Sequence, residues 1–300
     1  IQKLLPALLA DAAGVEIAQF GEGLRDGFPG AGDHGGGVAM GAAGGLGEDA
    51  VDDAEFQHVL RGDLHAVGGF LRLGAVAPED GGGGFRRDHA VDGVLEHQHL
   101  VGGGDGAIAE EVLKHKSISQ VDLVDIDGHV IEQCKKHFKA VHKGVFDDKR
   151  LHVYAEDAFK FLKDDATESR YDLIIADRPD PVGPAAVLFA DEFYKLVRRA
   201  LTPHGVACFQ NGVPLLQAEE LTETAKQIAG VFEASGAFLT VVPTYIGGYM
   251  ALTWASRGFR LGDGAKMQTV RDRFKASQIH TDYYTPDIHY AAFSLPPFVK

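Results

Sequence analysis

Two aspartates in the middle of the chain, Asp177 and Asp180, are the residues whose type and spacing could do chemistry. They lie on a loop with three prolines and a glycine that begins directly after the apolar run Leu173 to Ala176. Two carboxylates three positions apart on a stiffened loop could bind a polycation, take a proton from an amine, or do both. The alternative is a turn in which the aspartates only cap backbone amides.

The apolar run before this loop is predicted to form a buried β-strand. Its residues favour a strand, and the prolines prevent the strand from continuing. In open α/β sheets, ligands bind beyond the carboxyl ends of the strands. The loop is therefore where a site is expected if the chain forms such a sheet.

A glycine turn, Gly102 to Gly106, precedes a predicted amphipathic helix. It follows a strand at Leu100 and Val101, and a helix is predicted over Ala107–Lys116. Gly102, Gly104 and Ala107 fit the spacing G-x-G-x-x-A, a short pattern typical of the opening of a nucleotide-binding βαβ unit. Glycines at a turn let the backbone approach a ligand closely.

Carboxylates also follow the next predicted strands. The strand Val121–Ile126 carries Asp125, which is about 20 residues after the glycines and could hold ribose hydroxyls. Asp127 could do the same or could cap the next helix. With the strand Leu151–Ala155 included, acids end all four of the first strands: Asp105, Asp125, Glu156 with Asp157, and Asp177.

Strands and helices alternate through the rest of the chain. The predicted helices are Val130–Phe138, Phe159–Lys163, Phe189–Leu201 and Ala218–Phe232, and the further strands are Val206–Phe209, Phe238–Val242 and Tyr249–Ser256. The last two strands are close enough to form a hairpin. This order predicts an α/β fold with a doubly wound sheet and an antiparallel last strand.

Residues 1–100 have a different composition and are predicted to be an atypical glycine-rich segment before a catalytic domain at 101–300. They hold 22 of the 38 glycines, and no Ser, Thr, Asn, Tyr, Trp or Cys occurs before Ser117. A helix at Leu4–Ala13 and a short helix or strand at Ala54–Leu60 are the only elements expected. The segment is a flexible extension, a divergent domain or, our preferred hypothesis, translation in a wrong reading frame, because linkers are usually rich in Ser, Pro and Lys as well as Gly. Histidines in it, including His97 and His99, are expected to be solvated.

Composition limits the partners and the compartment. The net charge of −14 argues against nucleic acid, and most of it belongs to residues 1–100. No apolar run approaches the ~20 residues of a membrane span, and the first residues lack a secretory signal pattern. Cys134 and Cys208 are the only cysteines and are interpreted as structural thiols, so a cytoplasmic location is expected.

Across residues 100–300 the chain resembles the spermidine synthases, a family of polyamine aminopropyltransferases. The matching motifs are Gly102 to Gly106, Val124 to Asp127, Glu156-Asp157, Asp177 to Pro184 with Leu188-Phe189, Gln210 to Gly212, Pro243 to Tyr245, and Tyr283 to Pro296. The resemblance implies a Rossmann-like, methyltransferase-type sheet and a homodimer or homotetramer. It also implies transfer of an aminopropyl group from decarboxylated S-adenosylmethionine to putrescine, giving spermidine and methylthioadenosine.

The resemblance also implies a role for each matching residue. Asp177 is the implied base. Residues implied to bind decarboxylated S-adenosylmethionine are Gly102, Gly104, Asp105, Asp125, Glu156, Asp157, Ala158 and Pro184. Residues implied to bind putrescine are Asp180, Gln210 and Tyr245. No metal and no cofactor is expected, because the sulfonium of the donor is already a good leaving group.

Two features depart from the family pattern. Arg178 and Pro179 stand where the family has small residues. A guanidinium turned toward Asp177 would lower the pKa of that carboxyl and repel a cationic acceptor, whereas one that points outward into solvent would be harmless. The small N-terminal β-domain of the family has no match in residues 1–100. Two alternatives therefore stay open: an S-adenosylmethionine-dependent putrescine N-methyltransferase, and a catalytically silent homologue. A carboxylate at Asp105 disfavours the first, because it would repel the donor's own carboxylate.

Overall fold

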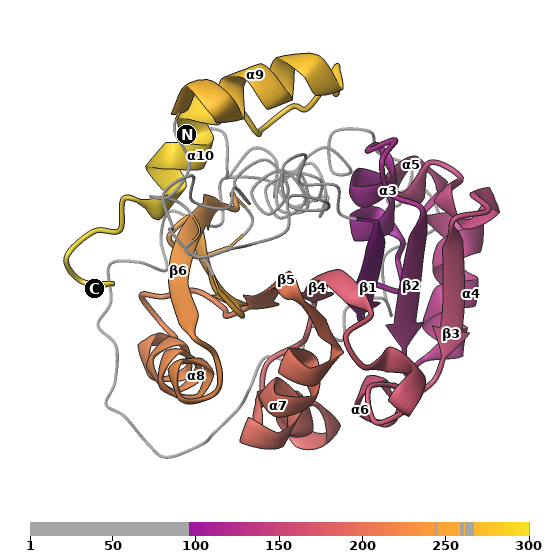
Figure 1. The fold of residues 1–300 in the computed structure, drawn as a ribbon, viewed down its shortest axis with the longest axis horizontal. Coiled ribbons are helices and arrows are strands. Elements are labelled where there is room, and N and C mark those ends of the chain that lie inside the picture. The colour runs from indigo at the N-terminus through magenta and orange to yellow at the C-terminus, as the bar shows by residue number, and fades with distance from the viewer. Residues whose placement is uncertain (1–95, 244, 259–260, 262–266, 300) are drawn as a thin grey trace, which may run out of the picture. The chain divides into compact units, whose positions relative to one another are not determined.

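The computed structural model describes residues 96–243, 245–258, 261 and 267–299, and these contain a seven-stranded sheet with helices on both faces (Figure 1). The strand order is β3-β2-β1-β4-β5-β7-β6. The strands are β1 (His97–Val101), β2 (Gln120–Asp125), β3 (Leu151–Ala155), β4 (Tyr171–Ala176), β5 (Leu201–Gln210), β6 (Ala234–Val241) and β7 (Tyr249–Ser256). The first five are parallel, and β7 runs antiparallel to both β5 and β6.

Helices connect the strands and cover the sheet. The α-helices are α3 (Ala107–Leu113), α4 (Gly128–His137), α5 (Lys139–His142), α6 (Ala158–Phe161), α7 (Asp191–Ala200), α8 (Ala218–Val231), α9 (Met267–Ser277) and α10 (Pro286–Phe293). Short 3₁₀ helices are η3 (Val145–Asp147), η4 (Asp165–Thr167) and η5 (Gly183–Phe189). In Figure 1, α6, α7 and α8 lie on one side of the sheet, and α3, α9 and α10 lie on the other.

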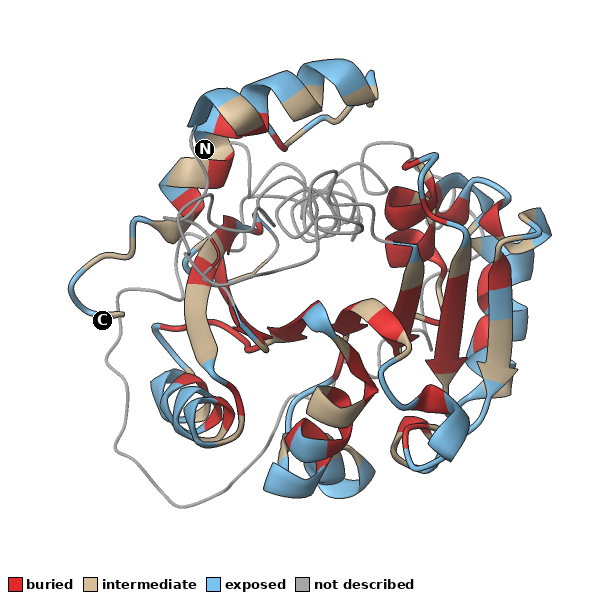
Figure 2. Ribbon diagram, viewed as in Figure 1, coloured by how far each residue is buried: buried red, intermediate tan, exposed pale blue. Residues whose placement is uncertain are grey.

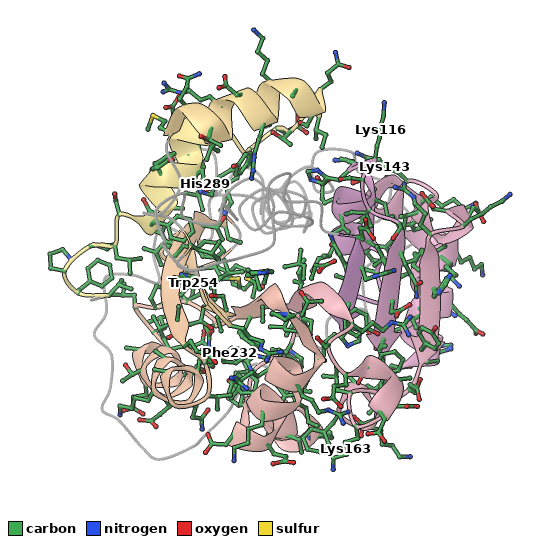
Figure 3. All side chains as sticks on the ribbon, viewed as in Figure 1. Lys116, Lys143, Lys163, Phe232, Trp254 and His289 are labelled. Atoms are coloured by element: carbon green, nitrogen blue, oxygen red, sulfur yellow. The ribbon has the colours of Figure 1, made fainter. Side chains whose placement is uncertain are left out.

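Each face of the sheet has its own apolar core, because side chains alternate between the two faces along a strand. Ile175 and Trp254 belong to the core under α3, α9 and α10, whereas Ile174 and Phe232 belong to the core under α6 to α8. Trp254 and Phe232 are labelled in Figure 3 on the two sides of the sheet. The central strands are buried on both faces, and the helices are exposed on their outer surfaces (Figure 2). The predicted doubly wound sheet with an antiparallel last strand is confirmed.

The two central strands bring the glycine turn and the proline-rich loop together. In the parallel pair β1 and β4, Val101 is opposite Ala176, so both strands end at the same level. The amide of Asp177 donates a hydrogen bond of 2.9 Å to the carbonyl of Val101. Residues 75 positions apart in the sequence thereby become neighbours at the carboxyl edge of the sheet.

The first described strand differs from the sequence expectation. β1 begins at His97, before the predicted boundary, and His99 is fully buried instead of solvated. Its ring stacks on Phe161 and Tyr171, each with a centroid separation of 5.1 Å, and Nδ1 lies 3.1 Å from the carbonyl of Asp122. Burial lowers the pKa of His99 to about 4, so it is a neutral core residue. The sequence did not indicate this buried position, because His99 follows directly on the glycine-rich segment.

The strand β5 is longer than predicted and begins directly after α7. Tyr171 is opposite Leu201 but Leu173 is opposite Val206, so the pairing with β4 is irregular here. A bulge of this kind fits Pro203, which has no N–H to donate to a regular ladder. Pro203 therefore lies inside β5, at the point where its pairing with β4 is irregular.

The predicted elements at 4–13 and 54–60, and the hypotheses for residues 1–95, fall outside the described residues. Among the helices within the described ranges, none is long and apolar enough to cross a bilayer.

Candidate active site

The glycine turn after β1 presses against the base of the Asp177 loop. Gly102 has φ +78°, a conformation that side chains with a Cβ rarely adopt. A Cβ on Gly102 would lie 2.2 Å from the carbonyl oxygen of Asp177, and one on Gly103 would lie 3.6 Å from its Oδ2. Glycine is therefore required at position 102, by the backbone conformation and by the space.

Asp125, at the end of β2, fixes the other side of the turn. Its Oδ2 accepts a hydrogen bond of 2.9 Å from the amide of Gly104, and its Oδ1 accepts one of 3.0 Å from the amide of Asp127. Asp127 accepts hydrogen bonds from the amides of His129 and Val130, so it caps α4. Asp127 was considered either as a ligand of ribose hydroxyls or as a helix cap, and the structure shows it as the cap of α4.

Three carboxylates converge on the turn. Burial, together with the negative charges of Asp105 and Asp125, raises the pKa of Asp177 to about 7. Burial also raises the pKa of Asp105, although its carboxylate accepts a hydrogen bond of 2.9 Å from the amide of Ala107. A partly dry site beside three acids attracts cations strongly, because a positive ligand relieves the repulsion between the carboxylates.

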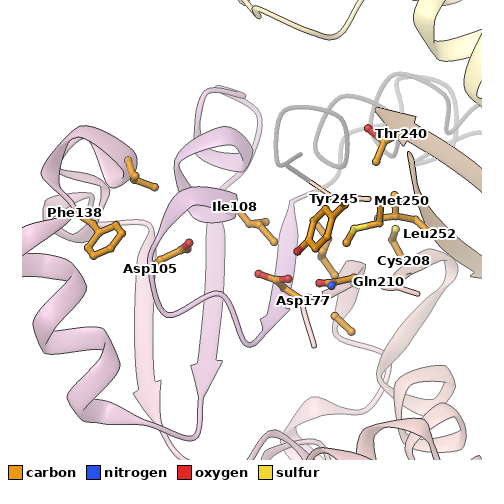
Figure 4. Close-up of a pocket in the computed structure, with 13 residues that line it drawn as sticks. Asp105, Ile108, Phe138, Asp177, Cys208, Gln210, Thr240, Tyr245, Met250 and Leu252 are labelled. Carbon is orange, nitrogen blue, oxygen red and sulfur yellow. The ribbon is translucent and has the colours of Figure 1, made fainter. Parts of the chain in front are cut away.

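A cavity of about 190 Å³ opens beside these acids (Figure 4). Four of the predicted site residues line it: Asp105, Asp177, Gln210 and Tyr245. Figure 4 shows the carboxylate of Asp177 between the carboxylate of Asp105 on one side and the Tyr245 ring and the Gln210 side-chain amide on the other. The cavity therefore joins the glycine turn to the end of β5 and to the turn between β6 and β7.

The end of β3 supplies the next part of the edge. The amide of Glu156 donates a hydrogen bond of 3.0 Å to the carbonyl of Asp125. Asp157 begins α6 and accepts a hydrogen bond of 2.8 Å from the amide of Phe159, and Ala158 is buried behind it. One oxygen of Asp157 is thus used as a helix cap.

Three predicted site residues, Glu156, Asp180 and Pro184, are exposed and do not line this cavity. Asp180 accepts a hydrogen bond of 3.1 Å from Nε2 of Gln217, which ties the loop to the segment before α8. Pro184 lies at the start of η5. Their predicted roles in binding the acceptor and the donor stay predictions.

Arg178 takes neither of the orientations that the sequence suggested. Its guanidinium does not face Asp177 and is not exposed: it lies on the opposite face of the sheet, only 1% exposed, near Tyr194 and Phe209. Consecutive strand residues point to opposite faces, which explains the separation. The effect expected of an inward guanidinium, a lowered pKa of Asp177, is absent, and the pKa is raised instead.

Sequence reasoning missed several residues that line the cavity: Ile108, Phe138, Val141, Cys208, Thr240, Met250 and Leu252. Most are apolar residues of helices and strands that give no local signal of a site. Thr240 is 1% exposed, and its hydroxyl has no hydrogen-bond partner among the described residues. A bound polar ligand could satisfy it, since buried hydroxyls in proteins are usually bonded.

The chain is similar in sequence and in fold to known proteins. A family model described as "Spermine/spermidine synthase domain" matches residues 95–261. A polyamine aminopropyltransferase of Ruegeria sp. (strain TM1040) is 43% identical over 69% of this chain and 72% of its own length. Polyamine aminopropyltransferase 1 of Pseudomonas aeruginosa is also 43% identical, over 67% of this chain and 69% of its own length. A crystal structure of a spermidine synthase in complex with the transition-state analogue AdoDATO is similar with a TM-score of 0.67 and 26% identity, covering 78% of this chain and 73% of that one.

Proposed function

The chain belongs to the spermine/spermidine synthase family and is an enzyme of the aminopropyltransferase type, and from this premise we propose its reaction. We propose that it transfers the aminopropyl group of decarboxylated S-adenosylmethionine to putrescine. The products are spermidine and methylthioadenosine. The observation that carries this proposal is the position of Asp177, a half-buried acid with a raised pKa that lines one cavity together with Asp105, Gln210 and Tyr245.

The donor would lie along the glycine turn. Gly102 and Gly104 keep the main chain of the turn packed against Asp177 and Asp125, and the donor would lie along this main chain. Asp125 would accept hydrogen bonds from the ribose, and Glu156, Asp157 and Ala158 would border the adenine. Asp105 would bind the ammonium of the aminopropyl chain. The carboxylate of Asp105 is suited to a donor that has lost its own carboxylate, because two facing carboxylates would repel each other.

Asp177 would act as the general base. A primary amine is protonated near pH 7, so the attacking nitrogen of putrescine must first lose a proton, and Asp177 would accept it. The nitrogen lone pair then forms a bond to the carbon next to the sulfonium, and the carbon–sulfur bond breaks with its electron pair going to sulfur. The thioether leaves as neutral methylthioadenosine, and the new secondary amine keeps its remaining protons as an ammonium. Asp177 then releases the proton it accepted to solvent, which regenerates the base.

Binding of the substrates would itself prepare the base. In the absence of ligand, burial and two neighbouring carboxylates favour the protonated form of Asp177. A sulfonium and an ammonium beside it favour the carboxylate instead, so the base becomes ionised where it is needed. In-line positioning of nitrogen, carbon and sulfur would supply much of the remaining rate.

The acceptor would occupy the cavity with Gln210 and Tyr245 along its methylene chain. Asp180 would meet the far ammonium, after release from Gln217. The position of Arg178 on the other face of the sheet supports activity, because no fixed cation faces the place where the acceptor's amine must bind.

Product identification tests this proposal. The purified full chain is incubated with putrescine and either decarboxylated S-adenosylmethionine or S-adenosylmethionine, and the products are identified by mass. We expect spermidine and methylthioadenosine in equal amounts from the decarboxylated donor and no product from the other. Methylated putrescine, or no product from either donor, would overturn the proposal.

A further inference from the structure

Arg178 is a buried cation without an ion-pair partner among the described residues. Its side chain is 1% exposed, and the ion pairs among the described residues do not include it; the carboxylate of Glu220 acts on it only through a longer-range charge interaction. Burying an uncompensated charge is costly, so the surroundings must satisfy it in another way. They do so with aromatic faces and with main-chain carbonyls.

The contacts of Arg178 join three segments of the chain. Nη1 donates hydrogen bonds to the carbonyl of Leu188, at the far end of η5, and to the hydroxyl of Tyr194, at 2.9 Å. Nε donates a hydrogen bond of 3.3 Å to the carbonyl of Gln210. The guanidinium carbon lies 3.6 Å from the centre of the Phe189 ring, which is a cation–π contact.

These contacts close the proline-rich loop at its base. Arg178 begins the loop and Leu188 ends it, so one side chain ties the two ends together, with Asp180 in the segment between them. The same side chain holds the main chain of Gln210, whose own side chain lines the cavity. Two of the three residues proposed to bind the acceptor, Asp180 and Gln210, thus belong to segments that Arg178 holds.

We propose that Arg178 is a positioning residue that sets the acceptor side of the site by fixing the loop 179–188 against the end of β5. This proposal rests on the proposed function, because the roles of Asp180 and Gln210 in binding the acceptor come from it. Arginine suits the task better than lysine, because its planar fork makes several directed hydrogen bonds while its face stacks on an aromatic ring.

Stability alone does not explain this arginine. Its Nη2 has no hydrogen-bond partner among the described residues, so the buried charge is not fully satisfied. Buried charges are often replaced by apolar residues of similar size without loss of stability. A role in fixing loop geometry accounts for an arginine where an apolar side chain would fill the same space.

The test compares Arg178→Met with Arg150→Lys in the full chain. Arg150 is the matched control, because it also donates hydrogen bonds to main-chain carbonyls, those of Leu113, His115 and Ile118, without contacting a cavity-lining residue. We expect Arg178→Met to raise the KM for putrescine at least tenfold, with the affinity for methylthioadenosine within twofold of wild type. Hydrogen exchange of the amides in 180–188 should become faster in this variant and stay unchanged in Arg150→Lys.

Four outcomes decide the matter. A putrescine KM within twofold of wild type in Arg178→Met, or an equal rise in Arg150→Lys, would overturn the proposal. If Arg178→Met does not fold, Tyr194→Phe, which removes one acceptor of Arg178, should still raise this KM two- to threefold, and an unchanged value would overturn it. If the wild type makes no spermidine, the proposed function has failed, and the exchange of 180–188 in the folded Arg178 variant decides separately whether the arginine holds the loop.

Discussion

Replacing Asp177 by Asn separates catalysis from stability, and the structure gives the sign of both effects. The carboxyl lies in a site where burial and two neighbouring acids raise its pKa from an ordinary 3.8 to about 7. The folded protein therefore binds this proton more tightly than the unfolded chain does. The stability that the group contributes is fully present below about pH 4 and is lost as the pH rises to about 7.

The size of the effect follows from the difference in pKa. About three pKa units at 1.36 kcal/mol each give a ceiling of about 4 kcal/mol at pH 8. Asp177 is only half-buried, so solvent and local rearrangement reduce the penalty, and we expect Asp177→Asn to raise the free energy of unfolding by about 1–3 kcal/mol at pH 8. At pH 4 the gain should vanish, because the wild-type carboxyl is then neutral in the folded state.

The assays are urea unfolding at pH 8 and pH 4, steady-state kinetics and calorimetry with methylthioadenosine. We expect kcat to fall by about 10²- to 10⁴-fold, the range for loss of a general base, with nucleoside affinity within about threefold of wild type. Asp180→Asn is the control for stability, since Asp180 is exposed. No gain in stability at pH 8 would refute the reasoning about burial, and a kcat within tenfold of wild type would refute the role as base.

Three further predictions concern the turn and the pH profile. The Gly102→Ala variant should unfold at a lower urea concentration and bind methylthioadenosine at least tenfold more weakly, because the new Cβ would lie 2.2 Å from the carbonyl oxygen of Asp177. The control is Gly144→Ala, where φ is a similar +83° but the space is open, and it should lower the free energy of unfolding by only about 1 kcal/mol. Equal losses of stability in the two variants would contradict the steric argument. Asp125→Asn should raise the KM for the donor about tenfold, because the NH₂ group of asparagine cannot accept the hydrogen bond that one of the two carboxylate oxygens now accepts from a main-chain amide. Asp127→Asn should leave this KM unchanged, since Asn caps a helix as well as Asp does. In a pH series, kcat/KM for the donor should rise to a plateau with a midpoint near pH 7. The midpoint of kcat/KM for putrescine should be lower, because the bound cationic donor stabilises ionised Asp177. A midpoint for putrescine above that for the donor would contradict this.

The sequence predicted the sheet and its carboxyl edge because local signals and tertiary demands agree there. Leu173 to Ala176 have the composition of a buried strand, the prolines end it, and the structure has β4 ending at Ala176. The glycine turn was recognisable because Gly102 requires a left-handed conformation that only glycine adopts easily. Asp105, Asp177, Gln210 and Tyr245 line one cavity as a consequence of the parallel strand order.

Other features depend on contacts between distant residues and had no local signal. The burial of His99 depends on Phe161 and Tyr171, which lie more than 60 positions away. The orientation of Arg178 depends on which face of the sheet holds Tyr194 and Phe209. The sequence of the loop alone does not contain this information. The cavity-lining role of Thr240 is equally invisible in a strand of mixed apolar and small residues.

A crystal structure with methylthioadenosine and putrescine bound together tests the central claim most directly. The account predicts that the nucleoside lies along Gly102 to Asp105 with its ribose on Asp125, and that one amine of putrescine lies within hydrogen-bond distance of Asp177, facing the sulfur. A nucleoside bound elsewhere, or an amine that points away from Asp177, would contradict it.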